Sequence, residues 1–309
     1  MCVWSLLGAF GGCRDDARSA KAGPSSAALG GSRPRVVCTI GMIRDAAERI
    51  AGDRVEVVGL MGEGVDPHLY KASPGDVRLL SEARLVLYNG LNLEGKLGDL
   101  LVRLARRTPT VAVTERIDES RLRSPPEFRG HYDPHVWFDV SLWMQAVERV
   151  RDALIEIDGD GRGEYMQRTD AYLAELAALH EECRRELATV PRASRVLVTA
   201  HDAFGYFGRA YDVDVHGIQG ISTESEPSLK DINSLVDLLV SRRVKAAFVE
   251  SSVPAKYVEA LVEGCRSRDH ALRIGGSLYS DAMGPAGTPE GTYVGMVRHN
   301  VRTIVSALR

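Results

Sequence analysis

Four side chains on widely separated segments have the chemistry of a divalent-metal site. The tripeptide Asp-Pro-His occurs twice, ending at His68 and at His135. A third histidine, His201, follows an apolar run, and Asp281 lies in a loop that ends in glycine. Neutral imidazole and carboxylate are ligands for zinc and for other borderline divalent ions. Because these residues are far apart in the sequence, only a folded chain can bring them together.

The proline before His68 and His135 makes both loops stiff. Proline fixes its own φ and favours extended backbone at the preceding aspartate. A stiff loop positions its imidazole in advance, which lowers the ordering cost of metal binding. Asp66 and Asp133 are expected to cap their loops, and the alternative is that they orient a histidine by hydrogen bonding to its ring.

The other histidines are weaker candidates. His131 lies four residues before His135, but a Gly-Tyr-Asp loop does not place the two on one helical face. The remaining histidines are interpreted as surface or packing residues, and they are His180, His216, His270 and His299. Any single member of the four-residue set could also be an ordinary hydrogen-bonding residue. The metal hypothesis therefore depends on the set as a whole.

Strand-like and helix-like segments alternate from Arg35 to the carboxyl end. Short apolar runs predict strands, and amphipathic helical spacing follows each of them. At residues 73–76, Ser-Pro-Gly-Asp predicts a helix start, with serine as the N-cap, proline in the first turn and aspartate facing the positive end of the dipole. This alternation predicts parallel sheets, with ligands bound beyond the carboxyl ends of the strands. All four candidate ligands are expected in loops.

The segment Glu164–Leu187 predicts one long helix. Its apolar residues recur every three or four positions, and roughly 24 residues would extend about 36 Å. We therefore expect an α/β fold of two lobes, each with a parallel sheet flanked by helices, joined by a single long α-helix. The expected domains are an amino-terminal lobe at 34–162, the linking helix at 163–190 and a carboxy-terminal lobe at 191–309.

Composition and missing motifs exclude several functions. The net charge is −3, so no basic face suits nucleic acid. The five cysteines form no CxxC pair, which argues against a thiolate metal site or a redox motif. The sequence contains no HExxH of zinc peptidases, no P-loop and no GxSxG elbow.

Residues 1–33 predict an export signal followed by a disordered tether. The apolar stretch Val3–Phe10 is too short to span a bilayer, but it precedes small residues and Cys13 as in a bacterial lipoprotein signal. Phe10 stands where a small aliphatic residue is usual, and no basic residue precedes the stretch. Cys13 is expected to carry a lipid anchor or to be removed with a cleaved signal, and a merely apolar amino terminus is the alternative.

From Arg35 onward the chain resembles the TroA-type zinc and manganese solute-binding proteins of bacterial ABC transporters. The segments that carry the resemblance are Gly64-Val-Asp-Pro-His-Leu-Tyr70, Asp133-Pro-His-Val-Trp-Phe-Asp139, Thr199-Ala-His-Asp-Ala-Phe-Gly-Tyr-Phe207, Phe248-Val-Glu-Ser-Ser252, Ser280-Asp-Ala-Met-Gly284 and Gly291-Thr-Tyr-Val-Gly-Met296. The resemblance implies capture of a metal ion without catalysis and delivery to a cognate ABC permease and its ATPase. It also implies a periplasmic or extracytoplasmic monomer, anchored through lipid if Cys13 is modified.

The same resemblance assigns His68 and His135 to the amino-terminal lobe and His201 and Asp281 to the carboxy-terminal lobe. Manganese-favouring members tend to have Glu in place of His201, and zinc-dedicated members often carry a histidine-rich loop between the first two ligands. This chain has His201, but its loop Glu115–Gly130 has no histidine, so it resembles the subtype that handles both ions. Zn²⁺ is the expected ion, because imidazole ligands favour it over Mn²⁺, and Mn²⁺ is the alternative in vivo.

Two other functions stay open at this point. A mononuclear zinc hydrolase would need an open coordination position, which Asp281 would close. A surface adhesin would bind its host ligand even with all four metal residues mutated. In the receptor, imidazole must be neutral to bind, so metal affinity is expected to fall as the pH drops through about 6.

Overall fold

The computed structural model describes Met1 and residues 33–128 and 130–309, and residues 33–309 form one compact unit. The predicted export signal and Cys13 lie outside the described residues. Within the described part of the chain, no helix has both the length and the apolar character needed to cross a bilayer.

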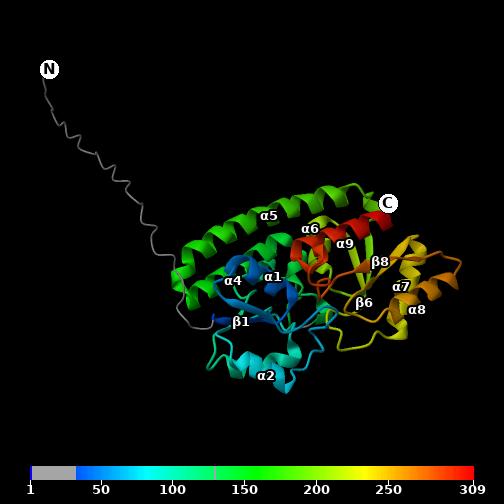
Figure 1. Cartoon of the computed structure of the whole chain (residues 1–309). Helices are drawn as coiled ribbons and strands as arrows, with labels where there is room; N and C mark the ends of the chain where they lie inside the picture. The colour runs from blue at the N-terminus through cyan, green and yellow to red at the C-terminus, as the bar shows by residue number, and fades with distance from the viewer. Residues whose placement is uncertain (2–32, 129) are drawn as a thin grey trace. The chain divides into compact units, whose positions relative to one another are not determined.

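The amino-terminal lobe is built on a parallel four-stranded sheet in the order β2-β1-β3-β4. Its strands are β1 (Arg35–Cys38), β2 (Glu56–Gly59), β3 (Leu85–Tyr88) and β4 (Thr110–Ala112). Its helices are α1 (Gly41–Ala51), α2 (Pro74–Ser81), α3 (Gly98–Leu104) and α4 (Val140–Ile157). Figure 1 shows α1 and α4 on one side of the sheet and α2 on the other. Helices on both faces explain why each of these short strands is apolar after its first residue or along its whole length.

The carboxy-terminal lobe repeats this plan with a divided sheet. Its strands are β5 (Val196–His201), β6 (Asp214–Gln219), β7 (Ala246–Glu250) and β8 (Arg273–Leu278). Its helices are α6 (Gly205–Tyr211), α7 (Leu229–Ser241), α8 (Lys256–Arg266) and α9 (Tyr293–Leu308). Two parallel pairs, β5-β6 and β7-β8, replace a continuous sheet, although β5 lies beside β7. At the end of that seam, the N–H of His201 donates to the Glu250 side chain instead of to a strand carbonyl.

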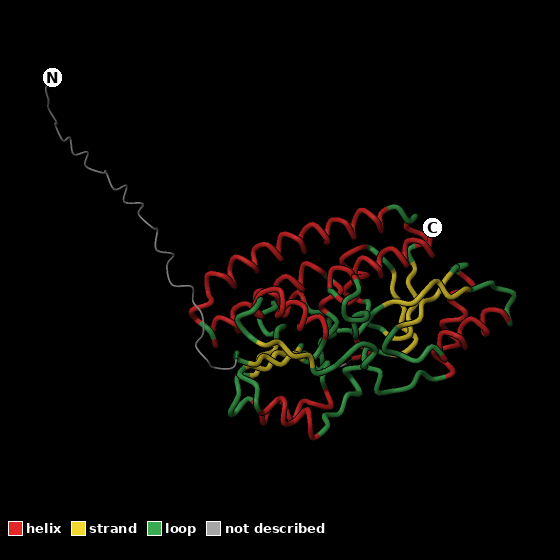
Figure 2. Tube along the Cα trace, in the orientation of Figure 1, coloured by secondary structure: helices red, strands yellow, loops and turns green. Residues whose placement is uncertain are grey.

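The long helix is confirmed as α5 (Arg162–Ala188), which runs along both lobes in Figures 1 and 2. Its 27 residues correspond to about 40 Å. It packs on α1 and α4 of the first lobe and on α9 of the second. Ion pairs also fix it to both lobes, from Glu175 to Arg49 at 2.8 Å and from Glu182 to Arg298 at 2.8 Å.

Aromatic side chains fill the junction between the lobes. The rings of Phe138 and Phe204 stack across it with centroids 4.2 Å apart, and Trp143 stacks on Tyr293 at 5.4 Å. All four side chains are buried. The predicted two-lobe α/β class is therefore confirmed, whereas the domain boundaries at 34–162, 163–190 and 191–309 stay a prediction.

Local sequence signals predict where a helix or strand forms more accurately than they predict its first and last residues. The helix predicted at 73–76 begins at Pro74, and Ser73 and Asp76 form a complete capping box. Helix α3 covers only Gly98–Leu104, because a 3-10 turn at Gly95–Leu97 precedes it. The polar segment before the second Asp-Pro-His contains only short 3-10 turns in its described part.

Candidate metal centre

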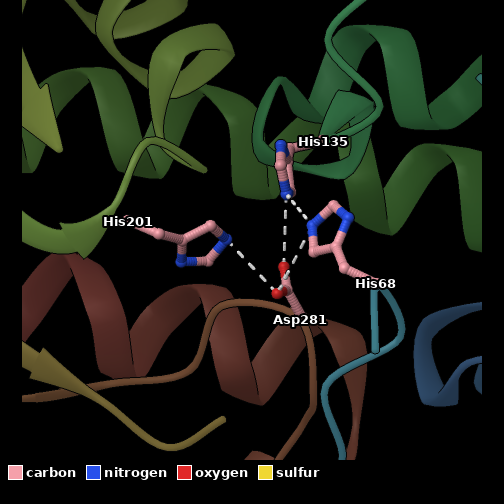
Figure 3. Close-up of side chains that lie close together, drawn as sticks. All are labelled: His68, His135, His201 and Asp281. Carbon is pink, nitrogen blue, oxygen red and sulfur yellow. Dashed lines mark hydrogen bonds and ion pairs between the residues drawn. The ribbon is translucent and has the colours of Figure 1, made fainter. Parts of the chain in front are cut away.

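The fold brings the four predicted ligand residues into one buried cluster. His68, His135, His201 and Asp281 point toward one another from four different segments (Figure 3). One ligand atom from each residue can be chosen so that all four lie within 4.8 Å of one another. Each residue is at most 2% exposed, so the cluster is closed off from solvent.

The spacing of these atoms suits a small tetrahedral ion. Nε2 of His135 lies 3.4 Å from Oδ1 of Asp281, and Nε2 of His201 lies 3.2 Å from Oδ2. The Nε2 atoms of His68 and His135 are 3.3 Å apart, and Nε2 of His68 is 3.9 Å from Oδ2 of Asp281. Tetrahedral zinc with ligands at 2.0–2.1 Å would hold them roughly 3.3 Å apart.

Several polar atoms that face the centre lack a hydrogen-bond partner. Among the described residues, neither carboxylate oxygen of Asp281 nor Nε2 of His201 makes a hydrogen bond, although both side chains are buried. Buried polar atoms are normally satisfied, and a buried carboxylate without a partner is strongly unfavourable. A bound cation would satisfy these atoms together.

The two Asp-Pro-His loops hold their histidines differently. Oδ1 of Asp66 accepts a hydrogen bond from the backbone N–H of His68 at 2.9 Å, as expected of a loop cap. Oδ1 of Asp133 makes the equivalent bond to His135 at 3.0 Å and also contacts its ring Nδ1 at 2.8 Å. The capping interpretation therefore describes Asp66, whereas Asp133 both caps its loop and orients the imidazole. With Nδ1 protonated toward Asp133, Nε2 is available to a metal.

His201 is the last residue of β5, not the loop residue that we expected. The carboxylate of Glu250, the last residue of β7, accepts two hydrogen bonds from His201. One comes from the ring Nδ1 at 2.6 Å and the other from the backbone N–H at 2.8 Å. Sequence reasoning missed Glu250. Its only signal is an acidic residue directly after an apolar strand, within a segment that carried the resemblance.

Asp281 lies in the loop that follows β8, as predicted. The preceding carbonyl, of Ser280, accepts a hydrogen bond from Nε1 of Trp137 at 3.1 Å. Trp137 is two residues from His135 and its ring lies 5.2 Å from the imidazole. The loop with the carboxylate is therefore tied across the junction to the loop with the second histidine.

Burial and neighbouring charges give the imidazoles different proton affinities. Burial lowers the pKa of His68 to about 3. Burial also acts to lower the pKa of His135, but its bonds to Asp133 and the nearby Asp281 outweigh that effect and raise the pKa to about 9. One ring of the cluster is therefore ready to bind a cation, and another holds a proton at neutral pH in the absence of metal.

His201 and Asp281, the other two members of the cluster, shift each other's pKa. Burial opposes a charge on His201, yet the carboxylates of Glu250 and Asp281 raise its pKa well above the ordinary value. Burial likewise opposes a charge on Asp281, but the facing imidazoles of His201 and His135 hold its pKa well below the usual range. The centre thus keeps a negative carboxylate, which favours a divalent cation that displaces the protons.

The other histidines are outside the cluster. His131 packs on Phe128 with ring centroids 5.2 Å apart. His180 contacts the hydroxyl of Tyr211 through Nδ1 at 3.1 Å. The rest contact surface or backbone groups, and they are His216, His270 and His299. In the described part of the chain, the group of potential metal ligands is the four-residue set that the sequence indicates.

This arrangement is suited to holding an ion and not to activating water. Asp281 supplies a carboxylate where a catalytic zinc would keep an open position. Asp133 and Glu250 bond to the Nδ1 side of imidazole rings, and Asp66 accepts from the backbone N–H of His68 and from Thr223, so all three nearby acids are already engaged. No general base is therefore placed beside the site among the described residues.

Comparison with known proteins gives a consistent result. Residues 36–307 match the family model of ZnuA, the periplasmic component A of a zinc-uptake complex. The zinc-binding protein TroA of Treponema pallidum is 50% identical over 286 residues, which cover 93% of this chain and 92% of TroA. The manganese-binding lipoprotein MntA of Bacillus subtilis is 47% identical over 275 residues, covering 89% and 90% of the two chains.

Solved structures agree with these sequence matches. The structure of periplasmic zinc-binding protein TroA from T. pallidum superposes with a TM-score of 0.88 and covers 90% of this chain and 99% of its own. Fe(III)-bound YtgA from Chlamydia trachomatis superposes with a TM-score of 0.81 at 29% identity, covering 89% and 98%. The chain belongs to the ZnuA family of periplasmic zinc-uptake components.

Proposed function

We propose that this protein captures Zn²⁺, or Mn²⁺, outside the cytoplasmic membrane and delivers it to an ABC permease for import. The observation that carries the proposal is the buried set His68, His135, His201 and Asp281, in which both oxygens of the carboxylate lack a hydrogen-bond partner. Three nitrogen ligands and one oxygen ligand suit a borderline divalent ion. The proposed ligand set is the same one that the resemblance implies.

The ligand set favours zinc as the preferred ion. Affinity for divalent metals rises from Mn²⁺ to Zn²⁺ at sites of this kind, and imidazole suits zinc. The named metals of the relatives differ, with zinc for TroA, manganese for MntA and Fe(III) for YtgA. We therefore propose zinc as the ion bound most tightly in vitro, with manganese as the alternative in a compartment that contains little free zinc.

The family consists of receptors of ABC transporters, which work with a permease and its ATPase. We propose that this chain likewise has a cognate permease. We also propose that it is a monomer and that a lipid on Cys13 attaches it to the membrane. Relatives named as lipoproteins, such as MntA of B. subtilis, support the anchor. A role as a receptor, not as a zinc hydrolase, follows from the same membership, and nothing in the structure favours the adhesin alternative.

Release must move a ligand loop, because the lobes are held together. Near His68, Oδ2 of Asp66 accepts a hydrogen bond from Thr223 of the second lobe at 2.6 Å. Close by, Lys96 pairs with Glu224 at 2.7 Å. The first contact joins the loop of His68, and the second joins the 3-10 turn Gly95–Leu97, to the segment between β6 and α7. Docking on the permease would release the ion by breaking such contacts and withdrawing part of the ligand set.

Metal analysis with paired histidine variants tests the proposal. Purified wild-type protein is expected to bind one Zn²⁺, and excess Mn²⁺ is expected to displace it poorly in a competitive titration. His135→Ala should lose the ion because it removes a nitrogen ligand from the centre. His131→Ala is the matched control, since His131 lies in the same loop but outside the cluster. Equal zinc content in both variants would show that the site assignment is wrong.

Zinc affinity is also expected to depend on pH over a higher range than the sequence alone indicates. The raised pKa values of His135, about 9, and of His201 mean that the ion must displace protons throughout the neutral range. Affinity should therefore be highest above about pH 9 and fall at least about tenfold per unit as the pH is lowered. Titration against a chelator of known proton affinity at pH 6, 7 and 8 measures this slope. A constant affinity over that range would contradict it.

A further inference from the structure

We propose that Arg123 is a positioning residue for the metal centre. Arg123 fixes the carboxylate of Asp133, which in turn orients His135, and the absence of a side chain at Gly205 leaves room for the guanidinium beside the first turn of α6. The inference rests on the proposed metal-binding function and names a further part of that site. Arg123 contacts none of the proposed ligands, and it acts only through Asp133.

Arg123 satisfies the outward oxygen of a buried carboxylate. Its Nη1 lies 2.5 Å from Oδ2 of Asp133, which is fully buried. The other oxygen, Oδ1, is already engaged by the backbone N–H and ring Nδ1 of His135. A buried carboxylate that loses its charge partner is strongly destabilised. The guanidinium thus holds the carboxylate in the orientation that fixes the imidazole.

The space for this guanidinium exists because residue 205 is glycine. A Cβ atom built on Gly205 would lie 1.1 Å from Nη1 of Arg123 and 2.0 Å from its Cζ. Any side chain at position 205 would therefore displace the guanidinium. A cation gains nothing from the positive end of a helix. The placement is therefore explained by Asp133 and not by α6 itself.

Tyr206, the next residue of α6, holds the same two residues through the backbone. Its hydroxyl donates to the carbonyl of Asp133 at 2.9 Å and accepts from the N–H of Arg123 at 3.0 Å. The N–H of Asp133 in turn donates to the carbonyl of Arg123 at 2.9 Å. Side-chain and backbone contacts therefore converge on one small cluster.

This cluster connects ligands from opposite lobes. Its first-lobe part is the loop that ends in His135, and its second-lobe part is the start of α6, four residues after His201. The α6 segment acts on the backbone of Asp133 through the Tyr206 hydroxyl and on its carboxylate through Arg123. A change at Arg123 or Gly205 should therefore alter metal binding although neither residue is a proposed ligand.

A double-mutant cycle tests this inference. Arg123→Ala and Gly205→Ala are each expected to weaken Zn²⁺ binding by about 10- to 100-fold, the usual effect of losing a group that orients a ligand. In the double variant the added methyl group meets no guanidinium, so binding should be no weaker than in Arg123→Ala alone. Arg121→Ala is the matched control, because the guanidinium of exposed Arg121 donates to the hydroxyl of Ser141 and not to Asp133, so this variant should bind zinc like the wild type.

A spectroscopic readout separates positioning from general destabilisation. The visible absorption spectrum of bound Co²⁺ should change in Arg123→Ala and Gly205→Ala and stay unchanged in Arg121→Ala. Arg123→Lys, which restores a positive charge, should recover part of the affinity. If either single variant fails to fold by circular dichroism, Tyr206→Phe, which removes only the hydroxyl, is expected to show a smaller loss of the same kind.

Three results would overturn the inference while leaving the proposed function intact. They are wild-type affinity and Co²⁺ spectrum in Arg123→Ala, additive losses in the double variant, or an equal loss in Arg121→Ala. Failure of the wild-type protein itself to bind Zn²⁺ would instead contradict the proposed function. The two failures are therefore distinguishable in one set of titrations.

Discussion

Asp281→Ala is expected to weaken zinc binding by more than a hundredfold. The carboxylate is the only anionic member of the ligand set, and its oxygens face the imidazoles of His135 and His201 at 3.4 and 3.2 Å. Removing one partner of a buried charged pair costs about 3–5 kcal/mol, which corresponds to a loss of more than a hundredfold. Isothermal titration in the presence of a competing chelator measures the change.

Asp281→Asn separates charge from shape in the same assay. The amide keeps the size of the side chain and one oxygen ligand, so most of its loss would reflect the missing negative charge. Asp53, whose side chain is fully exposed, supplies the control variant Asp53→Ala, which should bind zinc normally. If Asp281→Ala bound zinc as tightly as the wild type, Asp281 would not be a ligand. The possibility of a zinc ion with an open coordination position would then have to be considered again.

Removing the metal is expected to lower the melting temperature by roughly 10 °C. An ion that binds only the native state stabilises it by about 4 kcal/mol when present at a thousand times its dissociation constant. For a chain of this size, each kcal/mol corresponds to roughly 2–4 °C. The stabilisation should be large here because the proposed ligands come from both lobes, so unfolding of either lobe would destroy the site. Calorimetry with added zinc, and again with a chelator, measures the difference.

The ligand variants provide the control for this melting experiment. Asp281→Ala and His135→Ala should melt at the same temperature with zinc and with chelator, because they no longer bind the ion. His131→Ala should keep the full wild-type difference. A wild-type protein whose melting temperature ignores zinc would show that the ion does not bind the native fold preferentially.

Much of the architecture could be predicted because its signals are local. Strands buried on both faces read as short apolar runs, and the stripe from Tyr165 to Leu187 repeats at helical spacing. The four proposed ligands could be found because two of them share a tripeptide and all four lie at strand ends or in loops. Parallel sheets collect such residues at the carboxyl ends of their strands.

The partners of the ligands could not be predicted, because they depend on contacts between distant segments. Glu250 is 49 residues from His201 in the sequence. The two Asp-Pro-His copies are locally identical, yet their aspartates have different partners in space, Thr223 for Asp66 and Arg123 for Asp133. Identical local patterns therefore produced one loop cap and one residue that orients an imidazole.

The long helix also determines how slowly the ion can leave. Because α5 is paired with Arg49 of the first lobe and with Arg298 of the second, separation of the lobes would have to detach the helix from at least one lobe, with the loss of that ion pair and of part of the buried stripe. Thermal escape is then limited to brief opening of single loops. We therefore expect slow spontaneous exchange of the bound ion, so that contact with the permease sets the moment of unloading.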